Sequence, residues 1–144
     1  MKRPSEPLPL EVQQLLAPFF PGFDLSRVRI FEGIPRYVIG INKGGPIGYA
    51  DHNKIYLAPG YYRVETAEGL ALIAHEITHC RQYKQHGAWR FRAKYLAAYL
   101  NNRRHGLPHN QAYWEVPFEI EAREVERNVC AAMLRLQSLF NGNY

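Results

Sequence analysis

Two histidines and a glutamate in the middle of the chain have the spacing of a zinc-binding helix. His75 and His79 lie within residues 71–82, a stretch that is apolar before them and polar after them, as one helix would be. Residues four apart lie about 40° apart around a helix with a rise of about 6 Å, so both imidazoles can reach one metal ion. Glu76 is rotated by about 100° from His75 and would stand beside a water on that metal. The pattern predicts a zinc hydrolase with Glu76 as general base.

A zinc hydrolase needs a third protein ligand and an open position for water, so another element must contribute. The helix expected to begin near residue 117 carries Glu119 and Glu121, which point about 200° apart and cannot both face the metal. Ala122 is small and lies on the side of Glu119, which would let this helix approach the histidine helix closely. We therefore favour Glu119 over Glu121 as the third ligand. The weaker candidates are Glu115 and Glu124.

Composition is compatible with one globular domain. The chain has 144 residues, of which 47% are hydrophobic and 22% charged, and this length can bury a substantial core. No apolar run approaches the roughly 20 residues that cross a bilayer, and residues 1–10 lack the apolar core of a secretory signal. We expect a cytoplasmic protein, or one exported by a dedicated system without a Sec-type signal peptide. Cys80 and Cys130 are interpreted as small buried thiols.

Periodicity and turn residues predict an α+β fold. Helices are expected over residues 8–20, from Thr66 to about His86, over residues 88–101 and, within the last segment at residues 111–140, from about Pro117 onward. Strands are expected near residues 28–31, 36–41 and 48–57, the last with a polar turn at 51–54, and the glycine-rich residues 42–48 fit a hairpin connection better than a phosphate-binding loop. The expected domain spans residues 1–144, with a flexible terminus over residues 1–8. Its small mixed or antiparallel sheet would pack on the histidine helix and on a C-terminal helix carrying the glutamate.

Several segments, taken in order, resemble a known family. They are residues 8–10, 18–20, 24–30, 55–60 and 72–79, with Gln82 nearby. In this order they are similar to the DUF4157 domain, a zincin-like family often encoded near bacterial contractile injection systems, over roughly residues 8–86. The His-Glu-x-x-His pattern followed by Glu119-x-x-Ala122 also looks like the gluzincin arrangement. This resemblance implies a zincin-like metallopeptidase fold, one Zn²⁺ per chain, a peptide or protein substrate, and a place in a larger secretion or injection assembly.

One position departs from that resemblance. Gluzincins of this type often carry an aspartate after the alanine, where it accepts a hydrogen bond from a ligand histidine. Here the position is Arg123, which can only donate. A carbonyl or another carboxylate must then orient His75 or His79. The candidates for stabilising the transition state are Tyr113, His105, His109 and, if it points into the cleft, Arg123.

Three functions are compatible with these observations. The leading one is zinc-dependent peptide hydrolysis, with the strand at residues 53–58 as the edge along which an extended substrate adds. The second is a non-catalytic zinc-binding effector or scaffold module of a larger, contractile injection-type system. The third and least favoured is a basic nucleic-acid-associated protein, which would use residues 81–94 and the net charge of +5.

Overall fold

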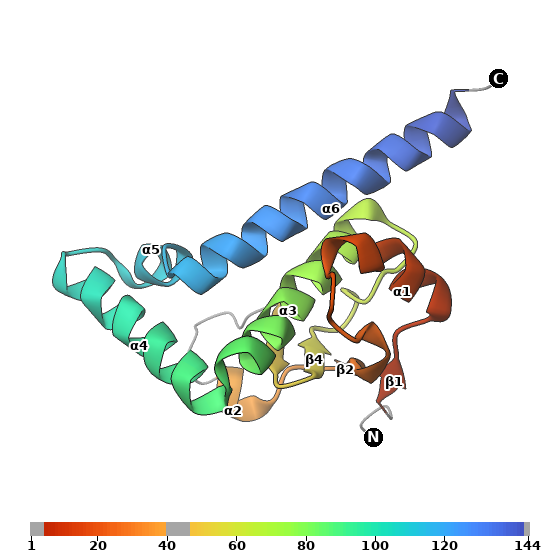
Figure 1. The fold of residues 1–144 in the computed structure, drawn as a ribbon. Helices are drawn as coiled ribbons and strands as arrows, with labels where there is room; N and C mark the ends of the chain where they lie inside the picture. The colour runs from red at the N-terminus through yellow and green to blue at the C-terminus, as the bar shows by residue number, and fades with distance from the viewer. Residues whose placement is uncertain (1–4, 40–46, 143–144) are drawn as a thin grey trace.

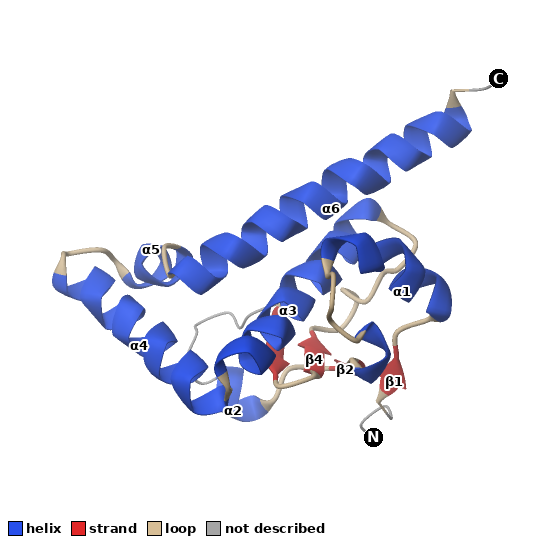
Figure 2. Ribbon diagram, in the orientation of Figure 1, coloured by secondary structure: helices blue, strands red, loops and turns tan. Residues whose placement is uncertain are grey.

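The computed structural model describes residues 5–39 and 47–142, and these form a mixed α+β fold, as the sequence predicts (Figure 2). In chain order the strands and α-helices are β1 (Glu6–Pro7), α1 (Leu10–Leu16), β2 (Arg29–Glu32), α2 (Arg36–Ile39), β3 (Gly48–Asp51), β4 (Lys54–Leu57), α3 (Ala67–His86), α4 (Ala88–Arg104), α5 (His109–Trp114) and α6 (Pro117–Asn141). Two short 3₁₀ turns, at Ala17–Phe19 and Leu25–Arg27, connect α1 to β2. No described helix is long and apolar enough to cross a bilayer.

The sheet has the strand order β1-β2-β4-β3, with one parallel pair, β2 and β4, and two antiparallel pairs. β3 and β4 form a tight hairpin, in which Gly48 lies opposite Leu57 and Asp51 opposite Lys54. His52, in the turn, has a φ of 58°, the left-handed conformation that such turns require. β4 therefore lies inside the sheet, so the expectation that residues 53–58 form a substrate-accepting edge is wrong. The edge is β3.

Helix α3 is the centre of the core. Its first turn is capped by Thr66, whose hydroxyl accepts a hydrogen bond from the Gly69 amide at 2.9 Å. It ends where Gly87 adopts a φ of 77°, and both boundaries agree with the sequence. Ile73 and Ile77 are completely buried within the cluster that α3 shares with the sheet and α1. The buried stretch of α3 also includes the polar side chains Glu76, His79 and Gln82.

Helix α6 lies along α3 and extends beyond the rest of the fold at its C-terminal end (Figure 1). Ala122 and Val129 are fully buried in this contact, and Met133 continues it toward the C-terminus. Ala122 adds little volume, so its presence on the packed face agrees with the close approach predicted for this helix. Helices α4 and α5 connect α3 to α6 (Figure 1).

Two expectations about local structure are wrong. Residues 36–41 were expected to form a strand, but Arg36–Ile39 is a short helix, because a short apolar run does not by itself distinguish helix from strand. The flexible terminus expected over residues 1–8 does not include its last three residues, since Glu6–Pro7 pairs with β2 and Leu8 is buried. The glycine-rich connection falls mostly on residues 40–46, outside the described residues. Both cysteines are free; Cys80 is buried, as expected, whereas Cys130 is half-buried.

Candidate metal centre

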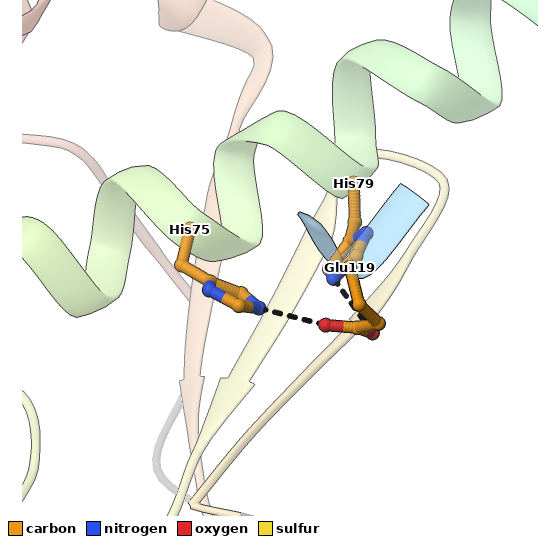
Figure 3. Close-up of side chains that lie close together, drawn as sticks. All are labelled: His75, His79 and Glu119. Atoms are coloured by element: carbon orange, nitrogen blue, oxygen red, sulfur yellow. Dashed lines mark hydrogen bonds and ion pairs between the residues drawn. The ribbon is translucent and has the colours of Figure 1, made fainter. Parts of the chain in front are cut away.

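The two histidines of α3 meet a glutamate of α6 at one point. Nε2 of His75 lies 3.1 Å from Oε2 of Glu119, and Nε2 of His79 lies 3.1 Å from Oε1 of the same carboxylate. One ligand atom from each residue lies within 4.8 Å of the others. Figure 3 shows the carboxylate facing both rings. These three side chains form a group that could hold a metal ion.

The donor chemistry of this group fits a zinc ion. Two imidazoles and one carboxylate are a ligand set found in zinc hydrolases, with a fourth position left for water. Two ligand atoms about 2.05 Å from a tetrahedral zinc lie about 3.3 Å apart, close to the two observed nitrogen–oxygen separations of 3.1 Å. Glu121, the alternative considered from the sequence, instead forms an ion pair with Arg81 at 3.3 Å. The geometry therefore brings Glu119 to the histidines and directs Glu121 elsewhere.

Gln82 orients the ring of His79. The Gln82 amide nitrogen donates to the carbonyl of Phe118 at 3.0 Å, which leaves its oxygen to accept from Nδ1 of His79 at 2.8 Å. A neutral His79 must then carry its hydrogen on Nδ1, so the lone pair of Nε2 points toward Glu119. Gln82 is completely buried. This one side chain fixes the ring and joins α3 to the start of α6.

Glu126 orients the ring of His75. Its Oε2 lies 2.8 Å from Nδ1 of His75, so a carboxylate holds the ligand ring, which is one of the two alternatives that Arg123 left open. Arg123 itself stacks over Trp114, with 3.7 Å from its Cζ to the ring centroid, and it does not line the cleft described below. The carboxylate that orients His75 is therefore that of Glu126, about one turn after Arg123, the position at which the gluzincin resemblance places it.

Glu76 lies beside this group. Its carboxylate is 5% exposed, and burial raises its pKa, although the nearby charges of His79 and His75 act in the opposite direction. The edge strand β3 passes directly over it, because a β-carbon added at Gly48 would lie 2.6 Å from Oε1 of Glu76. A buried carboxylate adjacent to the three candidate ligands is placed as a general base would be.

The metal-free site is held together by charge. Burial opposes charging of His75, but the hydrogen bonds with Glu119 and Glu126 outweigh it and raise the pKa of His75 to about 10. Burial likewise acts to raise the pKa of Glu119, and the hydrogen bonds from His75 and His79 overcome it, so that this pKa falls well below its usual range. Without a metal, the carboxylate is thus an anion between two rings that favour the charged form.

A cleft of about 470 Å³ opens next to the group. Among its lining residues are Tyr113 and His109, two of the predicted transition-state stabilisers, whereas His105 is exposed and bonds the carbonyl of Asn101 at 2.8 Å. Tyr95 also lines the cleft, and its hydroxyl donates to Oε1 of Glu119 at 2.9 Å. Burial, reinforced by the charge of Glu119, raises the pKa of Tyr113, so its phenol remains a donor at neutral pH.

Sequence reasoning missed three residues that contact the candidate ligands: Gln82, Tyr95 and Glu126. Two of them leave a signal. Glu126 follows Glu119 by seven residues, which returns it to the same helix face, and Gln82 follows His79 by three. Tyr95 leaves none, because its contact depends on how α4 and α6 cross rather than on a spacing within one helix.

Comparison with protein-family models identifies the N-terminal part of this chain. Residues 7–87, more than half of the chain, match the model of the eCIS core domain. The chain belongs to the eCIS core domain family. This is the DUF4157 family that the sequence resembles. The eCIS core match contains His75, Glu76 and His79, whereas Glu119 lies beyond it. Searches of curated proteins and of solved structures gave no match.

Proposed function

We propose that this eCIS core domain is a zinc-dependent metallopeptidase of the zincin type. The observation that carries the proposal is the convergence of His75, His79 and Glu119, whose ligand atoms lie within 4.8 Å of one another. Glu76 is buried at the same place, and both it and Glu119 line one cleft. A site for a metal, a base and a space for substrate therefore coincide.

Each side chain has a distinct role in the proposed reaction. His75, His79 and Glu119 would hold Zn²⁺, while Gln82 and Glu126 keep the two rings in their binding orientation. A zinc ion in such a site lowers the pKa of water toward about 7 and polarises a carbonyl group. Glu76 accepts the proton of the attacking water and passes it to the leaving amine.

The surroundings favour one hydrogen-bond donor for the developing oxyanion and one strand along which the substrate would bind. Tyr113 lines the cleft, while Arg123 is stacked on Trp114 and His105 is exposed; Tyr113 is therefore preferred, with His109 as the alternative. An extended peptide would add to the edge strand β3 rather than to β4, because β4 is paired on both sides. The hairpin thus supplies backbone groups beside Glu76.

Three variants test the proposal. Purified wild-type protein is expected to contain one zinc per chain by elemental analysis, Glu119→Ala to lose it, and Glu121→Ala to keep it, since Glu121 faces Arg81. Glu76→Gln is expected to keep zinc and to lose peptide cleavage by about 100-fold or more. Full cleavage by Glu76→Gln, or equal zinc in both Glu119→Ala and Glu121→Ala, contradicts the proposal.

The family match supports a second candidate, a non-catalytic metal-binding module of a contractile injection system, exported by that system. In this case zinc would stabilise the contact between α3 and α6 without supporting hydrolysis. Assembly with the injection system would then survive Glu76→Gln and fail in Glu119→Ala. Co-purification of both variants with the assembled system, measured beside peptide cleavage, separates the two candidates.

A further inference from the structure

The cleft beside the candidate metal centre is lined by residues of α3, α4, α5, α6 and β3. Glu76, His79 and Glu119 line it together with the edge strand β3. Tyr83 of α3 and the side chains of α4 and α5 provide an aromatic wall. A continuous series of ring contacts follows this wall: Tyr83 to Phe91 at 4.4 Å between centroids, Phe91 to Tyr95 at 5.9 Å, and Tyr95 to Tyr113 at 5.8 Å.

Three hydroxyl groups of this wall have hydrogen-bond partners within the protein. Tyr83 accepts from Nε of Arg92 at 3.4 Å, and Tyr95 donates to Glu119 at 2.9 Å. The Tyr99 hydroxyl lies 2.7 Å from Nδ1 of His109. With these hydroxyls engaged, Tyr83, Tyr95 and Tyr99 offer mainly ring carbons to the cleft, whereas the Tyr113 hydroxyl is the donor proposed for the oxyanion. Such a surface favours an apolar ligand and, through offset or edge-to-face contacts, an aromatic one.

The β3 wall provides backbone groups for an extended chain. In an antiparallel hairpin the residues alternate between pairs that exchange hydrogen bonds and pairs that do not. The amide of Ala58 donates to the carbonyl of Ile47 at 2.9 Å, which makes Gly48 and Ala50 members of non-bonded pairs. Their N–H and C=O groups therefore point away from β4, and no described backbone group bonds them. Both residues line the cleft.

We infer that this cleft binds an aromatic side chain of a peptide that extends along β3, a statement of substrate class that rests on the proposed peptidase function. The volume of about 470 Å³ lies within the range of about 300–1,000 Å³ of ligand pockets. Four of the aromatic side chains that line the cleft lie outside the family match at residues 7–87, namely Phe91, Tyr95, Tyr99 and Tyr113, whereas Tyr49 and Tyr83 lie within it. Most of the aromatic lining is thus supplied by the part of this chain that follows the eCIS core domain.

Binding without turnover tests the inference directly. The probes are four fluorescein-labelled peptides of glycine, serine and alanine that differ at one central position, which is Phe, Leu, Lys or Asp. Their affinity for the zinc-loaded Glu76→Gln variant is measured by fluorescence anisotropy. Leu96 lines the cleft and is 56% exposed, so Leu96→Trp fills the space. Leu100→Trp is the matched control, since Leu100 is similarly exposed on α4 but does not line the cleft.

The expected result is that the Phe peptide binds about 2–10-fold more tightly than the Leu peptide, and both more tightly than the Lys and Asp peptides. Leu96→Trp abolishes this preference and Leu100→Trp retains it. Should Leu96→Trp not fold, Tyr99→Leu replaces it and is expected to reduce the advantage of Phe over Leu. Equal affinities, no measurable binding, or an unchanged preference in the cleft variants would overturn the inference.

The same probes keep this inference separate from the peptidase proposal. Preferential binding of the Phe peptide without cleavage by the wild-type protein supports the binding site and contradicts the peptidase. Cleavage of all four peptides at similar kcat/KM supports the peptidase and contradicts the aromatic preference.

Discussion

A β-carbon at Gly48 would lie 2.6 Å from Oε1 of Glu76 and 3.0 Å from its Cδ. A side chain at residue 48 would therefore require the Glu76 carboxylate to move from its observed position. Glu76 is almost completely buried, so its carboxylate has little room to retreat. The absence of a side chain at residue 48 is therefore a condition for the position of the base.

The first prediction follows from this contact. Gly48→Ala is expected to keep the fold and the bound zinc but to lower kcat/KM by about 100-fold, because a displacement of about 1 Å at a reacting group has that effect. Zinc content and peptide cleavage are measured on the same sample. A variant that loses zinc together with activity, or one that retains full activity, would show that the contact does not position Glu76.

The second prediction concerns the partner of His75. Glu126→Ala removes the carboxylate that holds Nδ1 at 2.8 Å, and the zinc affinity is expected to fall by about 10–100-fold. Glu124→Ala is the matched control, because it removes the same charge from the same helix at an exposed position. Competition with a chelator measures both affinities. Equal losses in the two variants would attribute the effect to net charge rather than to ring orientation.

The third prediction concerns the buried amide of Gln82. Gln82→Leu removes both the acceptor for His79 and the donor to Phe118. The metal-free protein is expected to lose about 1–3 kcal/mol in its free energy of unfolding, and the zinc affinity to fall by about 10–100-fold. Gln82→Glu retains an acceptor for His79 and should lose less affinity. Urea unfolding and chelator competition measure the two quantities, and identical behaviour of the two variants would refute this role.

The fourth prediction is that zinc uptake releases protons. Hydrogen bonds with Glu119 and Glu126 raise the pKa of His75 to about 10 against the effect of burial, so the metal-free protein carries this ring charged at about pH 8. Zinc binds only the neutral ring. Calorimetry in buffers of different ionisation enthalpy is expected to show about one or more protons released per zinc. Heats that do not depend on the buffer would contradict it.

The same shift determines how the stability of the metal-free protein depends on pH. The folded pKa of His75 lies above the reference value of 6.5, so its charged form stabilises the fold fully below about pH 6.5. This contribution is lost as the pH rises toward about 10. Zinc affinity changes in the opposite direction and falls as the pH is lowered, because protons compete for the ring.

Local spacing made the centre of the site predictable. His75, Glu76 and His79 belong to one helix, whose start after Thr66 and end before Gly87 depend on capping residues that are visible in the sequence. The preference for Glu119 over Glu121 came from helix geometry together with a small neighbour, and the structure places Glu119 at the histidines. In each case the relevant contact lies on a face that the helical period specifies.

Contacts between elements could not be predicted in the same way. Residues 53–58 were expected to form an edge strand. Which strand of the β3–β4 hairpin lies inside the sheet depends on which one pairs with β2, and β2 is distant from both in the sequence. The helix at Arg36–Ile39 was mistaken for a strand because four residues contain too little periodicity. The bond from Tyr95 to Glu119 requires α4 to be in place over α6, and no spacing within either helix encodes it.

The three candidate ligands are divided between two parts of the chain. The segment that matches the family supplies His75 and His79, and α6, outside the match, supplies Glu119 together with Glu126. A metal ion held by all three would link α6 to α3, since releasing α6 from α3 would leave the ion with only two protein ligands. The free energy of metal binding and that of helix docking are then thermodynamically linked. Pulling α6 away from α3 would then weaken metal binding, and removing the metal with a chelator would weaken the docking of α6 on α3.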